Sequence, residues 1–485
     1  MYTIDKFFHS TFWFGLGLLL NRTKYILLTI IIFHLGLINV AIFYISIYFV
    51  SSIASFVHRL VSSNYNRFLR DRAFLAEAKN LHATLNSSLA LSLSLGVGAS
   101  FITFFLSWPI AALFKEPQLV KTIQLLSLTI PFLIMSRQIT QILSMLARYR
   151  EAVIFHNIID TTLTLVVAYA SIVLFTSNLY TALLWQVLVT ILSALIGIVL
   201  LHKIVPTFRL DFTRIHIPVK LTKTIVINAS FALLFSQGDI FIVGFYFDLL
   251  TVGSYIGLLV IPRLLYAIAT SVFGMFLPTA ASFSKEKEKM AFFSKKVFRY
   301  MLIVSFPLLL LVLLYPKETG AIIHVHAIDQ TTLQLFALAY FLRSWGWLGG
   351  QVLIASKTAY TNMKINAFLT IFVIFSVFVI TPRFGFNGIG WVFLLAALLD
   401  ATFKVYLCYK NLQIILVSKD ILALIGMILL LYLFHKIIAP INFFIFLGYF
   451  PLVYLIFLLS TGSLPFSFLR TSFHEIKVRT KKHSL

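Results

Sequence analysis

Thr122-Ile-Gln-Leu-Leu-Ser-Leu128 returns about 210 residues later as Thr332-Leu-Gln-Leu-Phe-Ala-Leu338. In both copies a Gln-X-Leu triplet follows at the same spacing, as Gln141-Ile-Leu143 and as Gln351-Val-Leu353. Repetition at one fixed offset predicts a chain made of two related halves. Two related halves that face one central site are typical of membrane transporters.

Composition places both halves in a membrane. Hydrophobic residues are 60% of the 485 residues, charged residues are 11%, and the mean hydropathy is +0.97. Such a chain has too little polar surface to cover a soluble globule. A helix needs about 20 apolar residues to cross the hydrocarbon core, so about fourteen spans fit in the chain. The single cysteine, Cys408, excludes a disulfide framework or a thiolate metal cluster within one chain, and we expect no bound metal or organic cofactor.

Apolar runs predict helices centred near residues 21, 47, 98, 132, 164, 190, 234, 265, 306, 343, 372, 398, 428 and 451. The predicted parts are an N-terminal six-helix half (1–205), a cytoplasmic linker (206–222), a C-terminal six-helix half (223–412), an additional helix pair (413–465) and a basic cytoplasmic tail (466–485). Because each half has an even number of spans, both enter the membrane in the same direction. The expected fold is an all-α polytopic membrane protein with a parallel repeat around a central cavity.

A turn is expected between the first two spans, at His34-Leu35-Gly36. The sequence that follows it, Val40-Ala-Ile-Phe43, matches Val252-Gly-Ser-Tyr255 at nearly the same repeat offset. The second copy also follows a predicted turn, at Phe247-Asp248. The two turns therefore support the repeat.

Positive charge predicts the topology. The chain has 39 Lys and Arg against 16 Asp and Glu, and the cations gather between residues 59 and 79, 203 and 223, and 285 and 299. Short loops rich in Lys and Arg stay in the cytoplasm, so we expect both termini on the cytoplasmic side. The expected location of the protein is the cell (inner) membrane. Nucleic acid is a poor partner for these loops, because they lack interleaved aromatic residues and flank lipid spans. Anionic lipid headgroups are the simpler partner.

Several charged residues fall inside predicted spans, where the cations outnumber the anions. The cations are Arg22, Lys24, Arg137, Arg263, Arg343 and Lys404, and the anions are Asp160, Asp239 and Asp400. A cation at the centre of a lone helix costs roughly 2.5 to 3.5 kcal/mol, so we expect these side chains to face a wet cavity rather than lipid.

Some of these charges have structural explanations. Asp400 and Lys404 are four residues apart on one helix face, and a simple ion pair is the expected arrangement. Arg22 and Lys24 could instead extend to the membrane interface. For these four residues the sequence leaves open whether they bind substrate, balance charge or couple an ion.

Arg263 and Arg343 are candidates for lining a substrate path. Arg263 follows Pro262, which bends its helix, and Arg343 lies near the middle of its span. Arg137 lies at a depth similar to that of Arg343 in the other half, so the two would suit a phosphate clamp. Asp239 could balance Arg263 or carry a coupling proton or sodium ion.

Short motifs in this order resemble the polysaccharide and O-antigen flippases. The motifs are Gly15-Leu-Gly-Leu-Leu-Leu-Asn-Arg22, Asp239-Ile-Phe-Ile-Val-Gly-Phe245, Val252-Gly-Ser-Tyr255, Pro278 before a basic stretch, and Phe384-Gly-Phe-Asn-Gly-Ile-Gly390. These flippases belong to the multidrug/oligosaccharidyl-lipid/polysaccharide exporter (MOP) superfamily, and the resemblance covers about residues 10 to 410.

The resemblance implies export of a lipid-linked oligosaccharide by a monomer that works with polysaccharide assembly proteins and is not itself an enzyme. An ion-coupled multidrug antiporter is the transport alternative, but its pocket should favour carboxylates over cations. A glycan polymerase or glycosyltransferase is the enzymatic alternative, but the external connection from Lys317 to Asp329 is short for such a site. The sequence contains no Gly-x-x-x-x-Gly-Lys-Ser/Thr loop, so we expect no nucleotide motor.

Overall fold

In the described residues of the computed structural model, every regular element is a helix. These residues are 35–69, 78–146, 148–170, 178–205, 239–271, 286–322, 329–356 and 358–414, with the single positions 17, 20, 24, 27, 28, 32, 227, 230, 231, 276, 280, 283, 426 and 454. The linker 206–222 and the tail 466–485 lie outside them, as does Arg22. The predicted domain boundaries stay predictions.

Seven helices in the described residues are long and apolar enough to cross a membrane. They are Leu37–Ser62, Leu85–Leu113, Arg150–Tyr169, Leu179–Ile204, Leu249–Thr270, Lys287–Leu314 and Tyr360–Asn411, and a pair bent by 44°, Gln118–Ser127 with Ile130–Ser144, forms a further candidate. The chain is therefore an all-α polytopic membrane protein, as predicted. The spans predicted near 21, 234, 428 and 451 fall mostly outside the described residues, so the count of fourteen stays a prediction.

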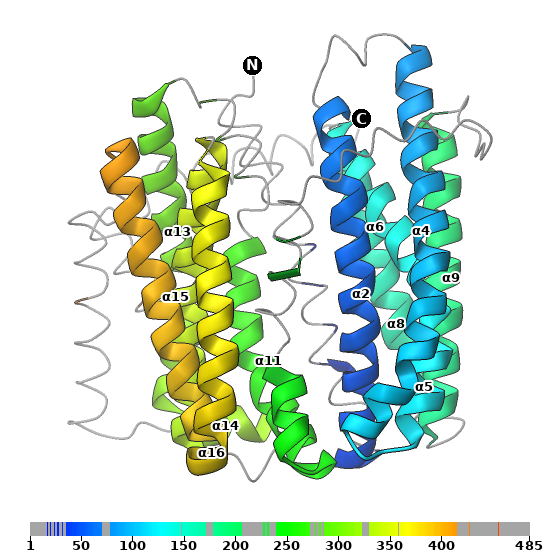
Figure 1. The fold of residues 1–485 in the computed structure, drawn as a ribbon. Coiled ribbons are helices and arrows are strands. Elements are labelled where there is room, and N and C mark those ends of the chain that lie inside the picture. The colour runs from blue at the N-terminus through cyan, green and yellow to red at the C-terminus, as the bar shows by residue number, and fades with distance from the viewer. Residues whose placement is uncertain are drawn as a thin grey trace.

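The N-terminal half contains α2 (Leu37–Leu69), α4 (Ala78–Leu113), α5 (Gln118–Ser127), α6 (Ile130–Met145), α7 (Tyr149–Val153), the π-helix η1 (Ile154–Ile159), α8 (Asp160–Tyr169) and α9 (Leu179–Ile204). The C-terminal half contains α11 (Leu249–Ser271), α13 (Lys287–Leu314), α14 (Pro316–Ile322), α15 (Gln330–Ala355) and α16 (Ala359–Leu412). Figure 1 shows the halves side by side, with α2 and α11 as the helices that face one another.

Helix α16 is two spans joined at a glycine. Its 54 residues would extend about 80 Å as a single helix, far more than the roughly 30 Å hydrocarbon core. Gly385 breaks it with φ of 56° and ψ of −142°, and Figure 1 shows the second part returning alongside the first. Glycine adopts this positive φ without the steric cost that a Cβ brings. The spans predicted near 372 and 398 are therefore both present.

Matching backbone geometry confirms the repeat. In the N-terminal half the amide of Arg148 donates to the carbonyl of Leu143 at 2.9 Å, and in the C-terminal half the amide of Thr358 donates to that of Leu353 at 2.9 Å. These positions have the offset of the sequence repeat. The expected first turn is also present, because Gly36 has φ of 87° and α2 starts directly after it.

The halves touch where α2 and α11 begin. A Cβ on Gly253 would lie only 2.5 Å from the carbonyl oxygen of Leu37, so the two backbones are in close contact. The ring of Phe241 packs on Phe49 and Phe114 of the N-terminal half, with centroids 6.0 and 6.2 Å away. Small residues permit this close approach between helices in lipid. We call the whole contact between α2 and α11, together with the packing of Phe241, the seam.

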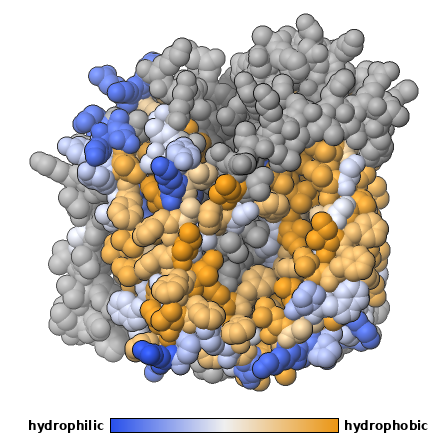
Figure 2. Space-filling model, in the orientation of Figure 1, coloured by the Kyte–Doolittle hydropathy of each residue, from blue (hydrophilic) through white to orange (hydrophobic). Residues whose placement is uncertain are grey.

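The outer surface suits a lipid environment. Large apolar side chains of α4 are exposed, among them Phe101, Phe105 and Trp108. Figure 2 shows apolar side chains over the middle of one face and hydrophilic side chains at its lower edge. An apolar band between polar edges is the surface that a membrane-spanning protein presents.

Candidate functional site

Arg263 lies beside a buried acid of its own half. Asp239 is 3% exposed, and its Oδ2 lies 3.6 Å from Nη2 of Arg263. The same oxygen accepts a 2.8 Å hydrogen bond from the hydroxyl of Tyr255, which precedes Arg263 on α11. Asp239 and Arg263 are therefore close together, and a role of Asp239 in charge balance or in ion coupling stays a prediction.

Arg263 also reaches across the seam. Its guanidinium carbon lies 4.9 Å from the ring centroid of Tyr48 on α2, a cation–π contact between the halves. Its Nε donates to the hydroxyl of Tyr340 on α15 at 3.3 Å. Within the described structure, the buried Nη2 of Arg263 has no hydrogen-bond acceptor. This side chain can therefore donate to a further anionic group.

Tyr340 contacts both Arg263 and Arg343. Its guanidinium carbon lies 5.7 Å from the Tyr340 ring centroid and 5.4 Å from that of Tyr266. The two tyrosine rings meet edge to face, with centroids 6.1 Å apart. We call Arg263, Arg343, Tyr48, Tyr266 and Tyr340 the arginine–tyrosine cluster.

The tyrosines of the cluster were not identified from the sequence. Tyr266 follows Arg263 by three residues on α11, and Tyr340 precedes Arg343 by three on α15. Residues three apart lie on one helix face, so this spacing was an available signal. Tyr48 gave no such signal, because it comes from the other half.

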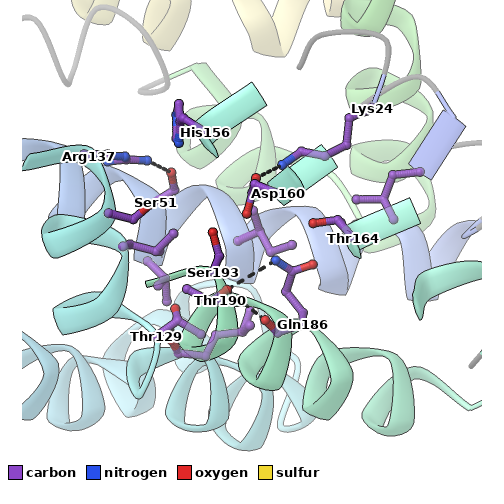
Figure 3. Close-up of a pocket in the computed structure, with 16 residues that line it drawn as sticks. Lys24, Ser51, Thr129, Arg137, His156, Asp160, Thr164, Gln186, Thr190 and Ser193 are labelled. Atoms are coloured by element: carbon purple, nitrogen blue, oxygen red, sulfur yellow. Dashed lines mark hydrogen bonds and ion pairs between the residues drawn. The ribbon is translucent and has the colours of Figure 1, made fainter. Parts of the chain in front are cut away.

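Lys24 and Arg137 line a pocket of about 120 Å³ inside the N-terminal half (Figure 3). Nζ of Lys24 lies 2.6 Å from Oδ2 of Asp160 at the start of α8. Arg137 on α6 donates to the hydroxyls of Ser51 and Ser55 on α2, at 3.0 and 2.7 Å. Lys24 is 7% exposed, so its side chain is buried within the protein.

The two arginines predicted to form a phosphate clamp, Arg137 and Arg343, contact different side chains, and the clamp stays a prediction. Arg137 lies in the pocket wall, and Arg343 lies in the arginine–tyrosine cluster. The neighbour that Arg343 meets through Tyr340 is Arg263 of its own half. Similar depth along two repeats does not fix the direction in which a long side chain extends.

Asp400 and Lys404 form the expected ion pair on α16, with Nζ of Lys404 2.6 Å from Oδ1 of Asp400. Lys404 also donates to Oδ1 of Asn366 at 2.9 Å. Both charged residues pack against glycines of α15, since a Cβ on Gly346 would lie 2.0 Å from the Asp400 carboxylate and one on Gly349 2.9 Å from Lys404. The pair therefore lies at the contact between α16 and α15, and its role in coupling stays a prediction.

Among the described residues, no group of three or more His, Cys, Asp or Glu side chains is arranged to hold a metal ion. The ionic groups of the two regions are instead arginines, lysines and isolated carboxylates. Arginine and lysine side chains of this kind can bind anionic groups.

Comparison with known proteins identifies the family. Residues 49–323 match the family model described as polysaccharide biosynthesis protein. The chain belongs to this family. A search of curated protein sequences gives no significant match.

Several solved structures have the same fold as this chain. The inward closed conformation of the lipid II flippase MurJ superposes with a TM-score of 0.68 and 16% identity, covering 92% of this chain and 97% of that one. An outward-facing multidrug resistance MATE family transporter of the MOP superfamily gives 0.66 and 12%, covering 83% and 95%. MATE in complex with MaL6 gives 0.64 and 13%, covering 84% and 97%. The chain has the fold of the MOP superfamily, as the sequence motifs predicted.

Proposed function

We propose that this protein moves a polyprenyl-diphosphate-linked oligosaccharide from the cytoplasmic to the outer leaflet of the cell membrane for surface polysaccharide biosynthesis. The observation that carries the proposal is the buried Nη2 of Arg263 at the seam, which lies 3.6 Å from Asp239 but has no hydrogen-bond acceptor among the described residues. A diphosphate offers acceptor oxygens and negative charge, and arginine binds such groups through directed hydrogen bonds.

The arginine–tyrosine cluster suits both parts of such a headgroup. Arg263 and Arg343 would bind the diphosphate, and the faces of Tyr266 and Tyr340 would pack on the sugars next to it. Asp239 compensates one of the two positive charges while the site is empty, which lowers the cost of keeping the arginines in the membrane. The polyprenyl tail would stay in the surrounding lipid.

Alternating access would follow from movement of the halves at the seam. Tyr48 and Arg263 come from different halves, so binding of a diphosphate to Arg263 would compete with this contact and favour separation of α2 from α11. Each negative charge that leaves an inside-negative cell releases about 2.3 kcal/mol per 100 mV, so the membrane potential can drive part of the cycle. Asp239 is our candidate for coupling a proton or sodium ion.

The protein would act as a monomeric transporter and not as an enzyme, with both termini in the cytoplasm, and it would supply polysaccharide assembly proteins on the outer face. Family membership and the fold support transport of a lipid-linked glycan, and the excess of cations over anions in the membrane argues against an exporter of organic cations.

The amount of lipid-linked oligosaccharide in each leaflet of the cell membrane, measured in cells, tests the proposal. Deletion of the gene should cause this lipid to accumulate on the cytoplasmic leaflet with loss of surface glycan, and the wild type should restore export. The double variant Arg263→Gln/Arg343→Gln should not restore it. The matched control is Lys364→Gln, which removes an exposed cation that lies 4.7 Å from the Tyr360 ring outside the cluster. An unchanged pool with altered drug sensitivity would refute the proposal and support the antiporter.

A further inference from the structure

The pocket in the N-terminal half is a second polar site, distinct from the arginine–tyrosine cluster. Side chains from α2, α5, α6, η1, α8 and α9 line it together with Lys24 and Leu28. None of the five cluster residues lines it. Ser51 in its wall is one helical turn along α2 from Tyr48, so the pocket lies next to the seam but opens within one half.

Three buried polar atoms of the pocket have no hydrogen-bond partner among the described residues. Thr164 and Ser193 are each 2% exposed, and in the described structure neither hydroxyl oxygen has a hydrogen-bond partner. Nδ1 of His156 is also buried without one. Figure 3 shows the hydroxyls of Thr164 and Ser193 directed into the pocket from opposite sides. Each such group destabilises the folded chain unless a ligand or water satisfies it.

The charges around these atoms select the class of ligand. Lys24 and Arg137 are the cations of the lining and Asp160 is its one carboxylate, so the lysine, arginine and aspartate side chains together carry a net positive charge. A cationic ligand would meet two positive groups. An oxyanion would gain from both and would accept hydrogen bonds from the hydroxyls, since charge-assisted bonds are the stronger ones.

The backbone at this site has an unusual local form. His156 lies in the π-helix η1, and Asp160 follows directly at the start of α8. Single π-helical turns within α-helices occur frequently at functional sites, because the wider turn changes the direction of the side chains. The distortion therefore coincides with the polar part of the pocket.

We propose that this pocket binds a small oxyanion, either a carboxylate or a phosphate group. Two sources offer that chemistry: an acidic sugar of the transported glycan, or a free anion such as inorganic phosphate. Binding of a free anion is independent of the function proposed above, whereas the acidic-sugar source rests on it.

Thermal unfolding of the purified full-length chain in detergent tests the proposal. Tryptophan fluorescence would report the melting temperature with inorganic phosphate, glucuronate or neutral glucose, each at an ionic strength matched with sodium chloride. Phosphate or glucuronate should raise the melting temperature, because a ligand that binds the folded state stabilises it, and glucose should not. A rise with glucuronate alone would identify an acidic sugar as the source, and a rise with both would identify any small oxyanion.

Two variants assign the effect to the pocket. Thr164→Val/Ser193→Ala should weaken the apparent affinity at least tenfold, because both hydroxyl donors are lost. The control Ser305→Ala removes a buried hydroxyl that bonds the Met301 carbonyl in the other half, and it should leave the affinity unchanged. Titration calorimetry of the unmodified protein provides the second measurement if the double variant does not fold.

The absence of any anion effect beyond matched chloride would overturn the inference, and so would equal effects in the double variant and the wild type. That result would leave the transport test with Arg263→Gln/Arg343→Gln unaffected, because the cluster and the pocket share no residue. Failure of this inference is therefore distinguishable from failure of the proposed function.

Discussion

Gly253→Ala is expected to open the seam between the halves. The new Cβ would lie 2.5 Å from the carbonyl oxygen of Leu37, a distance below the 3.0 Å that real Cβ contacts essentially never pass. A backbone oxygen cannot rotate away as a flexible side chain can, so α2 and α11 must separate by at least about 0.5 Å at this point. Overpacking of this kind costs about 1 to 3 kcal/mol, which shifts an equilibrium between closed and open seams by about 5- to 150-fold.

Spin labels across the seam measure this shift. Cysteines at the exposed positions Ile38 and Leu250 carry the labels, and the buried native Cys408 is protected from labelling. Pulsed electron paramagnetic resonance in nanodiscs should show a larger fraction of long distances for Gly253→Ala. The control is Gly98→Ala, where a Cβ would have no neighbour within 4 Å. An unchanged distance distribution for Gly253→Ala would refute the argument that this glycine permits seam closure.

Two further predictions concern stability. Asp400→Leu should lower the free energy of unfolding by about 3 to 5 kcal/mol, because it leaves the charge of Lys404 buried, whereas Asp400→Leu/Lys404→Met should recover most of the loss. Chemical unfolding in detergent measures both, and equal losses for the single and double variants would contradict a structural pair. Gly385→Ala should cost about 1 to 2 kcal/mol in the same assay, because alanine is strained at a positive φ, and a stability equal to wild type would show that the turn adjusts without strain.

Much of the fold could be predicted from the sequence. Composition established a membrane protein, and the repeat of Thr122 and Gln141 as Thr332 and Gln351 established the two halves. These predictions succeed because the number of apolar residues that cross a membrane and the residues that form a turn depend only on short stretches of sequence.

An ion pair between residues close in the sequence could be predicted, whereas contacts between residues far apart in the sequence could not. The Asp400–Lys404 pair follows from four-residue spacing on one helix. The Lys24–Asp160 pair joins residues far apart in the chain, and the contact of Arg263 with Tyr48 crosses between halves. In helices that are apolar on all sides, no periodic pattern indicates which face meets which neighbour. The division of the cations between the pocket and the cluster therefore required the structure.

Reconstituted transport tests the central claim most directly. Proteoliposomes would contain the purified protein and a fluorescent polyprenyl-diphosphate oligosaccharide, and a membrane-impermeant reagent would report the leaflet that holds it. The wild type should translocate the lipid faster when the imposed potential favours outward movement of negative charge, and Arg263→Gln/Arg343→Gln should lose at least about tenfold in rate, which corresponds to roughly 1.4 kcal/mol. Equal rates for the wild type and the double variant would contradict the account.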